Sequence, residues 1–362
     1  MKTPRWFKKI KRNYNVLTGD LSFAEMEYLI KRDAPGMFDF YTQQFNVDKK
    51  RNIFIRWLIL LENMFAAFVL KLKPARRLVY LVAIIIFLKG LGSSDSVYLF
   101  AGFALVSILL AFELADKLMA KDELEIARTI QLQLLPEKAP SHPQMDIVFF
   151  METARDVGGD FFDFIHVGNR LTLVIGDISG KGMAAAIHMV QMNTILKGLR
   201  DVNDPGTLLK RLNQGLTGIL PKSVFLTASL FSVNGSGEAE LFRSGHLPVL
   251  RYSASRGSCE NLQPSGIGIG LAGQEAFAES LRGLTLKPEP GDVFVMYTDG
   301  LTETMNKSRS EFGEERLTQV LCLHAGGSVE EIRDAILSSV AAFRGSTMQH
   351  DDLTLIVIKY KA

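Results

Sequence analysis

The feature that most constrains this chain is a set of acidic residues placed where apolar runs meet glycine-rich turns. Residues 156–163 (DVGGDFFD) lead into residues 171–182, an apolar run that reaches Asp177 and continues as Ile-Ser-Gly-Lys-Gly. The arrangement recurs at Asp299 and Asp351, each next to another apolar run. A carboxylate at the end of a buried strand costs free energy unless it is paired or binds a cation. We therefore expect the fold to bring these turns together.

Carboxylates in such settings predict a site for divalent cations. The four that share this setting are Asp160, Asp177, Asp299 and Asp351. Oxygen ligands suit hard cations such as Mg²⁺ or Mn²⁺, and a two-metal cluster typically serves phosphate chemistry. A single aspartate in a turn is better explained as a turn or helix cap, which is our interpretation of Asp163 and Asp352. The separations of 17, 122 and 52 residues form no local motif, so composition alone leaves both explanations open.

Basic and acidic residues are unevenly distributed along the 362 residues, although the net charge is only +2. Residues 1–122 carry 19 basic against 11 acidic residues, and the remainder carries 22 against 28. The basic part suits an anionic membrane surface, whereas the acidic part argues against nucleic acid as a partner. The two cysteines, Cys259 and Cys322, have no metal-ligand spacing, and we expect reduced thiols in a cytosolic domain.

Two apolar runs in the first third predict a membrane helical hairpin. Residues 78–88 and 97–112 contain no charged residue and flank the expected turn 89–96. Each is slightly shorter than the roughly 20 residues that span a bilayer, but flanking residues can extend it. Basic residues at the outer ends place both termini in the cytoplasm, which predicts two spans in the inner (cytoplasmic) membrane. A buried soluble hairpin and an apolar dimer interface are the alternatives.

Residues 113–135 predict a continuous helix that Pro136 ends. Apolar residues recur on one face in steps of three and four: Ala120, Leu124, Ala127, Ile130 and Leu134. This face can pack against the next domain, or it can pair with its twin in a homodimer, as in a short coiled coil.

From residue 145 onward, short runs rich in Val, Ile and Phe are separated by longer helical stretches. Strands are expected at 145–151, 171–175, 224–233, 247–252, 292–297 and 353–359, and helices at 183–199, 205–220, 313–323 and 328–343. Strands grouped around paired helices favour an α+β sandwich with its sheets inside. The expected organisation is a basic cytosolic or interfacial helical segment at 1–73, the hairpin at 74–115, a linker helix at 116–140 and the sandwich domain at 141–362.

A series of short motifs between residues 124 and 360 carries a specific family resemblance. They are residues 130–131 (IQ), 134–136 (LLP), 154–163 (ARDVGGDFFD), 176–182 (GDISGKG), 244–246 (SGH), 297–303 (YTDGLTE), 312–313 (FG) and 351–354 (DDLT). In this order they resemble the SpoIIE/RsbU branch of the PPM metal-dependent serine/threonine protein phosphatases. The N-terminal third of the chain lies outside the resemblance.

The resemblance implies an αββα four-layer sandwich with two Mn²⁺ or Mg²⁺ ions between its sheets. It implies catalytic metal ligands at Asp160, Asp177, Asp299 and Asp351, with Asp177 bridging both ions and the backbone carbonyl of Ile178 as a further ligand. A metal-activated water would attack phosphorus in line, without a phospho-enzyme. Many members of the wider family have a histidine where Ile178 stands, so we expect a metal-bound water to protonate the leaving group.

The resemblance also implies a substrate class and a mode of control. Substrates of this branch are typically phosphoserine or phosphothreonine on STAS-domain anti-sigma-factor antagonists in partner-switching pathways. An N-terminal sensor or dimerising helix typically controls activity, which gives the hairpin and the linker helix a regulatory role.

Two other functions are weaker interpretations of the same residues. Residues 158–162 (GGDFF) superficially resemble the GGDEF turn of diguanylate cyclases, but the glutamate after the aspartate is absent and the other acidic turns stay unexplained. A catalytically inactive membrane scaffold that binds phosphoproteins is disfavoured because all four aspartates are present. His246 has no evident nucleophile partner, which indicates a structural role.

Overall fold

The computed structural model describes residues 65–66, 69–93, 95–221 and 223–361. The predicted basic segment 1–73 therefore lies almost entirely outside the described residues. The chain divides into two compact units, Met1–Leu118 and Met119–Ala362.

The predicted helical hairpin is present in the first unit. Its helices are α4 (Pro74–Ser93) and the first part of α5 (Ser96–Gln133). A Cβ atom added at Gly90 would lie 2.7 Å from the backbone nitrogen of Leu99, and one at Gly102 would lie 2.8 Å from the Cβ of Phe87. Glycine thus lets the two helices approach closely, as small residues do in membrane helix pairs.

Ion pairs also join α5 to the start of α4 and to Lys73 just before it, at the end of the hairpin away from the turn. Arg76 donates to Glu113 at 2.8 Å, and Lys73 donates to Asp116 at 2.6 Å. All four residues lie outside the apolar runs, so the pairs fix the helices to each other where the runs end. α4 also continues to Ser93, which corrects the expected turn at 89–96: the close approach at Gly90 stabilises a helix that the glycines alone would weaken.

Among the described helices, α5 is the one that is long and apolar enough to cross a membrane. Large apolar side chains of its first part are exposed, including Phe100 and Phe103. The helix predicted at 113–135 forms as the continuation of this apolar run and ends at Gln133. It ends two residues earlier than expected because the amides of Leu134 and Leu135 donate to carbonyls three residues back, which tightens the last turn.

The second unit contains two five-stranded antiparallel sheets. One has the order β1-β10-β9-β6-β7, and the other has the order β2-β3-β4-β5-β8. The first sheet comprises β1 (Met145–Glu152), β6 (Val249–Ser253), β7 (Ser258–Leu262), β9 (Val293–Tyr297) and β10 (Leu353–Tyr360). The second comprises β2 (Phe161–Val167), β3 (Arg170–Ile178), β4 (Leu226–Val233), β5 (Ala239–Ser244) and β8 (Gly283–Leu286).

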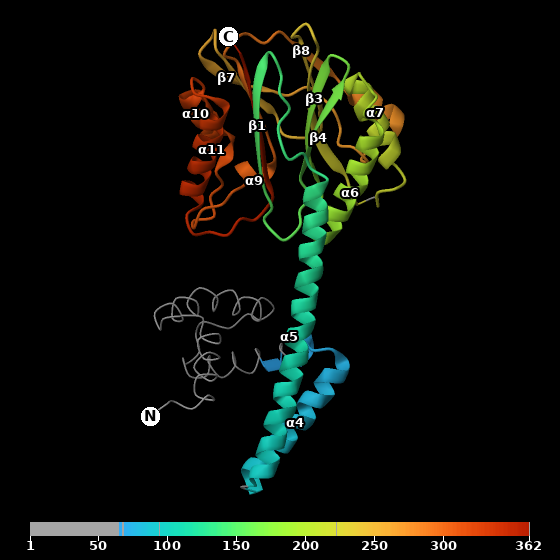
Figure 1. The fold of residues 1–362 in the computed structure, drawn as a ribbon, viewed down its shortest axis with the longest axis vertical. Coiled ribbons are helices and arrows are strands. Elements are labelled where there is room, and N and C mark those ends of the chain that lie inside the picture. Colours follow the sequence, from blue (N-terminus) through green and yellow to red (C-terminus); the bar gives the residue numbers. More distant parts are fainter. Residues whose placement is uncertain (1–64, 67–68, 94, 222, 362) are drawn as a thin grey trace, which may run out of the picture. The chain divides into compact units, whose positions relative to one another are not determined.

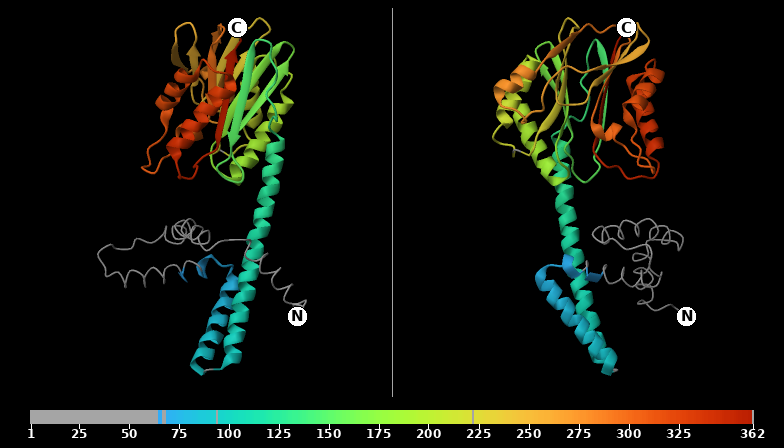
Figure 2. Two further views of the ribbon diagram at one scale, coloured as in Figure 1. Left: turned by 60° about the vertical axis from the view of Figure 1, so that its left-hand side comes forward. Right: turned by 180° about the vertical axis from the view of Figure 1, so that it is seen from behind.

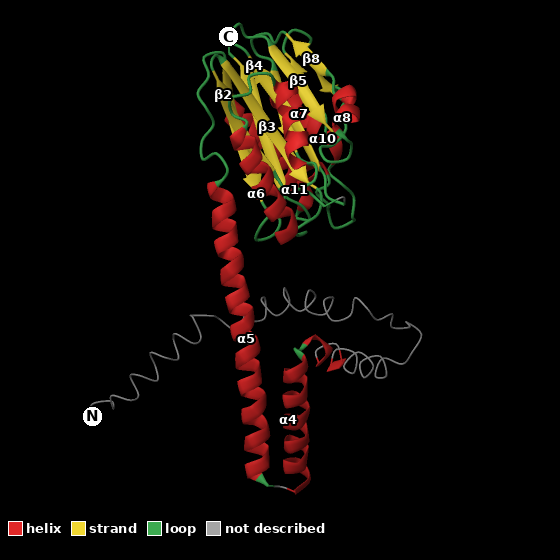
Figure 3. Ribbon diagram, turned by 90° about the vertical axis from the view of Figure 1, so that its right-hand side faces the viewer, coloured by secondary structure: helices red, strands yellow, loops and turns green. Residues whose placement is uncertain are grey.

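Helices cover the outer face of each sheet, as Figures 1 and 2 show. On the first sheet lie α10 (Gly313–His324) and α11 (Val329–Arg344), and on the second lie α6 (Met183–Gly198) and α7 (Pro205–Leu216). Figure 3 shows the second sheet face-on, with the short α8 (Gln274–Ser280) beside α7. The expected α+β fold with two sheets between helices is confirmed.

Apolar side chains between the sheets form the main core. Phe231 of β4 and Phe294 of β9 meet across the interface with ring centroids 4.8 Å apart. A second core lies under α10 and α11 and includes Tyr297 and Leu355. The central strands are therefore buried on both faces, which explains their nearly continuous apolar sequences.

Four strands were not predicted, namely β2, β5, β7 and β8. β5, β7 and β8 are short, and the first two carry charged residues, as in AELFRS and SCENL. Their positions nearer the sheet edges need less apolar sequence, so periodicity misses them. β2 begins directly after the acidic turn at Asp160, where the glycines suggested a loop instead.

The prediction of two separate thiols is wrong in this structure. Cys259 of β7 and Cys322 of α10 form a disulfide, with Cα atoms 6.2 Å apart. Packing of α10 on β7 brings together residues that are 63 positions apart, which the sequence spacing does not reveal.

Candidate functional site

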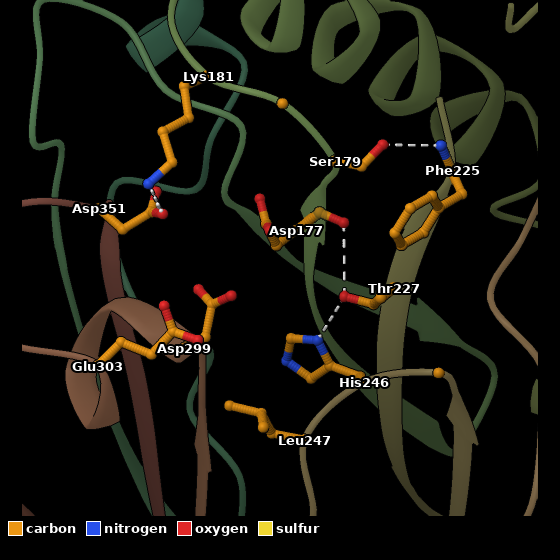
Figure 4. Close-up of a pocket in the computed structure, with 12 residues that line it drawn as sticks. Asp177, Ser179, Lys181, Phe225, Thr227, His246, Leu247, Asp299, Glu303 and Asp351 are labelled. Carbon is orange, nitrogen blue, oxygen red and sulfur yellow. Dashed lines mark hydrogen bonds and ion pairs between the residues drawn. The ribbon is translucent and has the colours of Figure 1, made fainter. Parts of the chain in front are cut away.

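Three of the predicted acidic turns meet in one pocket of about 440 Å³. Asp177 is the penultimate residue of β3, Asp299 begins the short helix α9 (Asp299–Thr302) after β9, and Asp351 precedes β10. Figure 4 shows their side chains converging from three separate segments of the chain. The opposite wall contains Phe225 and Leu247.

Crowding of negative charge is the main electrostatic property of this pocket. Burial, and then the charges of Asp299 and Asp351, raise the pKa of Asp177 to about 8. Burial and the charge of Asp351 likewise raise the pKa of Asp299. A cation bound beside Asp177 and Asp299 would compensate for the neighbouring negative charges and oppose both shifts.

Asp351 already has a cationic partner. Its carboxylate forms an ion pair with Lys181, whose Nζ also lies 3.3 Å from the carbonyl oxygen of His350. Lys181 stands between Gly180 and Gly182, both with positive φ angles (106° and 72°). This turn leads into α6 and projects the lysine over the acidic pocket.

Asp160 lies outside the set of residues that line the pocket. It is 1% exposed, and its Oδ2 accepts hydrogen bonds from the hydroxyls of Thr298 (2.7 Å) and Thr354 (2.6 Å). Burial first, and then the charge of Asp177, raise its pKa well above the usual range. The structure thus places Asp160 close enough to influence Asp177 but covers it with two threonines.

Two further aspartates have structural roles. Asp352 accepts hydrogen bonds from the backbone amides of Ala154 (2.9 Å) and Gly159 (2.7 Å) and so holds the first acidic turn against the last one. Asp163, inside β2, pairs with Arg200 at 2.8 Å. We predicted a turn or helix cap for both residues; neither caps a helix, but both have structural partners and leave the pocket to the other carboxylates.

His246, for which the sequence predicted a structural role, and Thr227, which the sequence did not single out, form a part of the pocket wall. Thr227 faces Asp177 in the β3–β4 register, and its hydroxyl lies 2.8 Å from Nδ1 of His246. Burial lowers the pKa of His246 to about 4, so the imidazole is neutral at pH 7. Its Nε2 lies buried near the backbone of Tyr297 without a hydrogen bond of good geometry. A structural role fits this buried, neutral side chain.

Glu303 is an acidic residue of the pocket that was not predicted from the sequence. It lines the pocket, and burial together with the charge of Asp299 raises its pKa. The signal was present in the spacing, because Asp299 and Glu303 lie one helical turn apart in the motif DGLTE.

The residues present fit a hard divalent cation. The described part of the chain holds no three acidic, histidine or cysteine side chains already gathered tightly enough to enclose an ion. The donors are nevertheless oxygens, and the raised carboxyl pKa values are what a cation would reverse. A Cβ at Gly159 would lie 2.9 Å from the carbonyl oxygen of Ile178 and 3.0 Å from Oδ1 of Asp177. Two of the predicted ligands therefore face the same small residue.

The charge of Asp177 should destabilise the protein when no metal is bound. Its pKa is raised in the fold, so its contribution to stability is lost as the pH rises from about 4 towards 8. We predict that Asp177→Asn raises the melting temperature of metal-free protein at pH 8 by about 5 °C or more. Thermal unfolding in EDTA measures this. The gain should shrink at pH 5, and an equal or lower melting temperature at pH 8 would contradict the prediction.

Comparison with known proteins identifies the family. The family model described as Stage II sporulation protein E (SpoIIE) matches residues 168–361. Phosphoserine phosphatase RsbU of Bacillus subtilis is 28% identical over 246 residues, which cover 67% of this chain and 71% of RsbU. Protein IcfG of Synechocystis is 28% identical over 283 residues, but the chain spans only 44% of its length.

Solved structures share the fold of the second unit. The SiaA-PP2C domain of Pseudomonas aeruginosa has a TM-score of 0.60 and 21% identity, over 68% of this chain and 99% of that one. The RsbU and RsbW domains of Rv1364c from Mycobacterium tuberculosis have a TM-score of 0.54 and 26% identity, over 64% of each chain. With the family model covering more than half of its residues, the chain belongs to the SpoIIE family of PP2C-type phosphatases and is a homologue of phosphoserine phosphatases.

Proposed function

We propose that this chain is a membrane-anchored, metal-dependent phosphatase that hydrolyses phosphoserine or phosphothreonine in a partner protein. The observation that carries the proposal is the convergence of Asp177, Asp299 and Asp351 from distant strand ends in one open pocket. With Asp160 and the carbonyl of Ile178, they form the ligand set that we propose for two Mn²⁺ or Mg²⁺ ions. Such ions would supply Lewis acidity that activates water and neutralises phosphoryl oxygens.

The chain's own residues would position this chemistry. Thr298 and Thr354 fix Asp160, and Asp352 holds the loop before it through two backbone amides. The buried imidazole of His246 is neutral at pH 7, so it is not a cationic acid for the leaving group. The proton for the serine or threonine oxygen is therefore better supplied by solvent in the open pocket.

The substrate that we propose is a STAS-domain anti-sigma-factor antagonist. The support is the membership of the SpoIIE family and the likeness to RsbU, a phosphoserine phosphatase. The pocket opens between Phe225 and Leu247 and the acidic turns, which leaves room for a phosphorylated side chain. The test compares the phosphoproteomes of cells with and without the gene. At least one phosphosite in a STAS domain should rise when the gene is absent. If none rises, the assignment is contradicted.

The anchor that we propose is the α4–α5 hairpin with two membrane spans. Its support is the exposed apolar surface of α5 together with the close glycine contacts to α4 and the ion pairs at their polar ends. α4 is the weaker span because it contains Arg76, Arg77 and Lys89, which would have to lie near the interfaces. Carbonate-resistant sedimentation of the full chain with membranes tests the anchor, and recovery as soluble protein would contradict it.

We propose that the end of α5 controls the site, and its hydrogen bonds to two neighbouring segments support this proposal. Gln131 is buried, and its side chain donates to the carbonyl of Gly158 (2.6 Å) and accepts from the amide of the same residue (3.2 Å). The carbonyl of Leu134 accepts from Lys197 (3.1 Å) and Asn193 (3.4 Å) of α6. One helix end thus holds both the loop before Asp160 and the helix that follows the Lys181 turn.

The apolar face of the same helix is only partly covered by the described residues of one chain. Ile130 is 52% exposed and Leu134 is half-buried. We propose that this face pairs in a homodimer and that a membrane signal shifts the helix between two arrangements that differ in pocket geometry.

Metal-dependent turnover is the first expected outcome. Wild-type protein should hydrolyse p-nitrophenyl phosphate with Mn²⁺ and lose this activity in EDTA. Asp177→Asn should lower kcat/KM by at least about 10³-fold, because it removes a charge that would hold both ions. Spectrophotometry of p-nitrophenol release measures both.

The control for that assay is Lys287→Gln, an exposed substitution outside the pocket, which should keep wild-type activity. Wild-type protein as inert as Asp177→Asn would favour the inactive phosphoprotein-binding scaffold.

Linker variants test the proposed control. Ile130→Asp and Leu134→Asp place charges on the apolar face, so they should disrupt the dimer and change turnover severalfold with the metal ligands intact. Size-exclusion chromatography with light scattering and the Mn²⁺ assay measure these effects. Leu132→Asp is the matched control because Leu132 is 47% exposed but points away from this face. Unchanged turnover and unchanged oligomeric state in Ile130→Asp would count against the proposal.

A further inference from the structure

The pocket contains a single basic side chain among its described lining residues. Four carboxylates line it, those of Asp177, Asp299, Glu303 and Asp351, and the basic residue is Lys181. Lys181 forms an ion pair with Asp351, and its ammonium carries the positive charge that a lysine ordinarily has at pH 7. The position of this one cation therefore matters for any anion that enters.

Lys181 is attached in a way that allows its head group to move. Its side chain is 51% exposed, whereas that of Asp351 is 26% exposed. Glycines with positive φ angles flank it on both sides, and four methylene groups separate its backbone from the ammonium. A solvent-exposed ion pair stabilises a protein only weakly, so this pair separates readily when a stronger ligand for either partner binds.

The carboxylate of Asp351 cannot bind the Lys181 ammonium and a divalent cation equally well at the same time. A cation of charge +2 at Asp351 would repel the ammonium and compete for the same carboxylate oxygens. The ammonium would then remain at the pocket wall without its acidic partner. A phosphoryl dianion entering the pocket offers the matching charge.

From this arrangement we propose that Lys181 contacts the phosphoryl group of the substrate and the product phosphate. We also propose that Lys181 stays paired with Asp351 until a divalent cation binds to that carboxylate. The inference rests on the proposed phosphatase function and deepens it by naming a substrate-binding residue. It also assigns Lys181 a second effect, because the same ammonium opposes the binding of the cation.

The test uses full-length wild type, Lys181→Gln, Lys181→Arg and the exposed control Lys287→Gln. Isothermal titration with Mn²⁺ alone should show Lys181→Gln binding the metal roughly three- to tenfold more tightly, because a repelling charge is gone. Titration with inorganic phosphate in saturating Mn²⁺ should show binding weakened about tenfold. Lys181→Arg should retain most phosphate binding, and Lys287→Gln should match wild type in both titrations.

Opposite changes in the two affinities distinguish this role from a structural one. If Lys181 only pins the turn before β10, Lys181→Gln should weaken Mn²⁺ and phosphate binding together, which would overturn the proposal. Unchanged phosphate affinity would overturn it as well. In an active enzyme, the Gln variant should raise KM for p-nitrophenyl phosphate about tenfold with a smaller change in kcat.

Failure of the proposed function would be recognised separately. Protein that binds Mn²⁺ and phosphate but releases no p-nitrophenol would refute the phosphatase activity. The two titrations need no turnover, so they would still confirm or reject the exchange of Lys181 between Asp351 and a phosphate anion.

Discussion

Repulsion between carboxylates confined in one pocket is the constraint on which the rest of this domain depends. Burial and mutual proximity make the ionised forms of Asp177 and Asp299 unfavourable, so the fold must hold them together by other means. It does so with two stiff sheets whose apolar faces interlock through pairs such as Phe231 and Phe294. The packed core between the sheets thus holds the acidic turns close together although repulsion between their carboxylates favours separation.

Close backbone approach is the second means of support. A Cβ at Gly300 would lie 1.9 Å from the carbonyl oxygen of Asp352, and one at Gly158 would lie 1.9 Å from Oδ2 of the same residue. The turns after β9, before β2 and before β10 can therefore touch only because two of them carry glycine. This explains in physical terms why glycine accompanies the acidic turns before β2 and after β9.

The parts of the fold and of the site that the sequence could predict are those that leave a signal within a short stretch of residues. Buried central strands such as β3, β9 and β10 are recognisable from their continuous apolar runs, and the aspartates next to them mark the site because unpaired acids are rare in such places. Edge strands such as β7 lack that signal, and the meeting of Cys259 with Cys322 depends on the packing of α10. The pairing of Lys181 with Asp351 spans 170 residues, so only the assembled fold reveals it.

Asp160 shows what the two-sheet design means for reading future variants. One carboxylate oxygen receives hydroxyls from Thr298, just beyond β9, and from Thr354, inside β10, while the residue itself opens β2 in the opposite sheet. This side chain therefore connects the two sheets through hydrogen bonds and also lies next to the acidic pocket. A variant at this position that loses activity could have lost the hydrogen bonds between the two sheets or a proposed metal ligand. Distinguishing these two causes requires a structural measurement in addition to the rate.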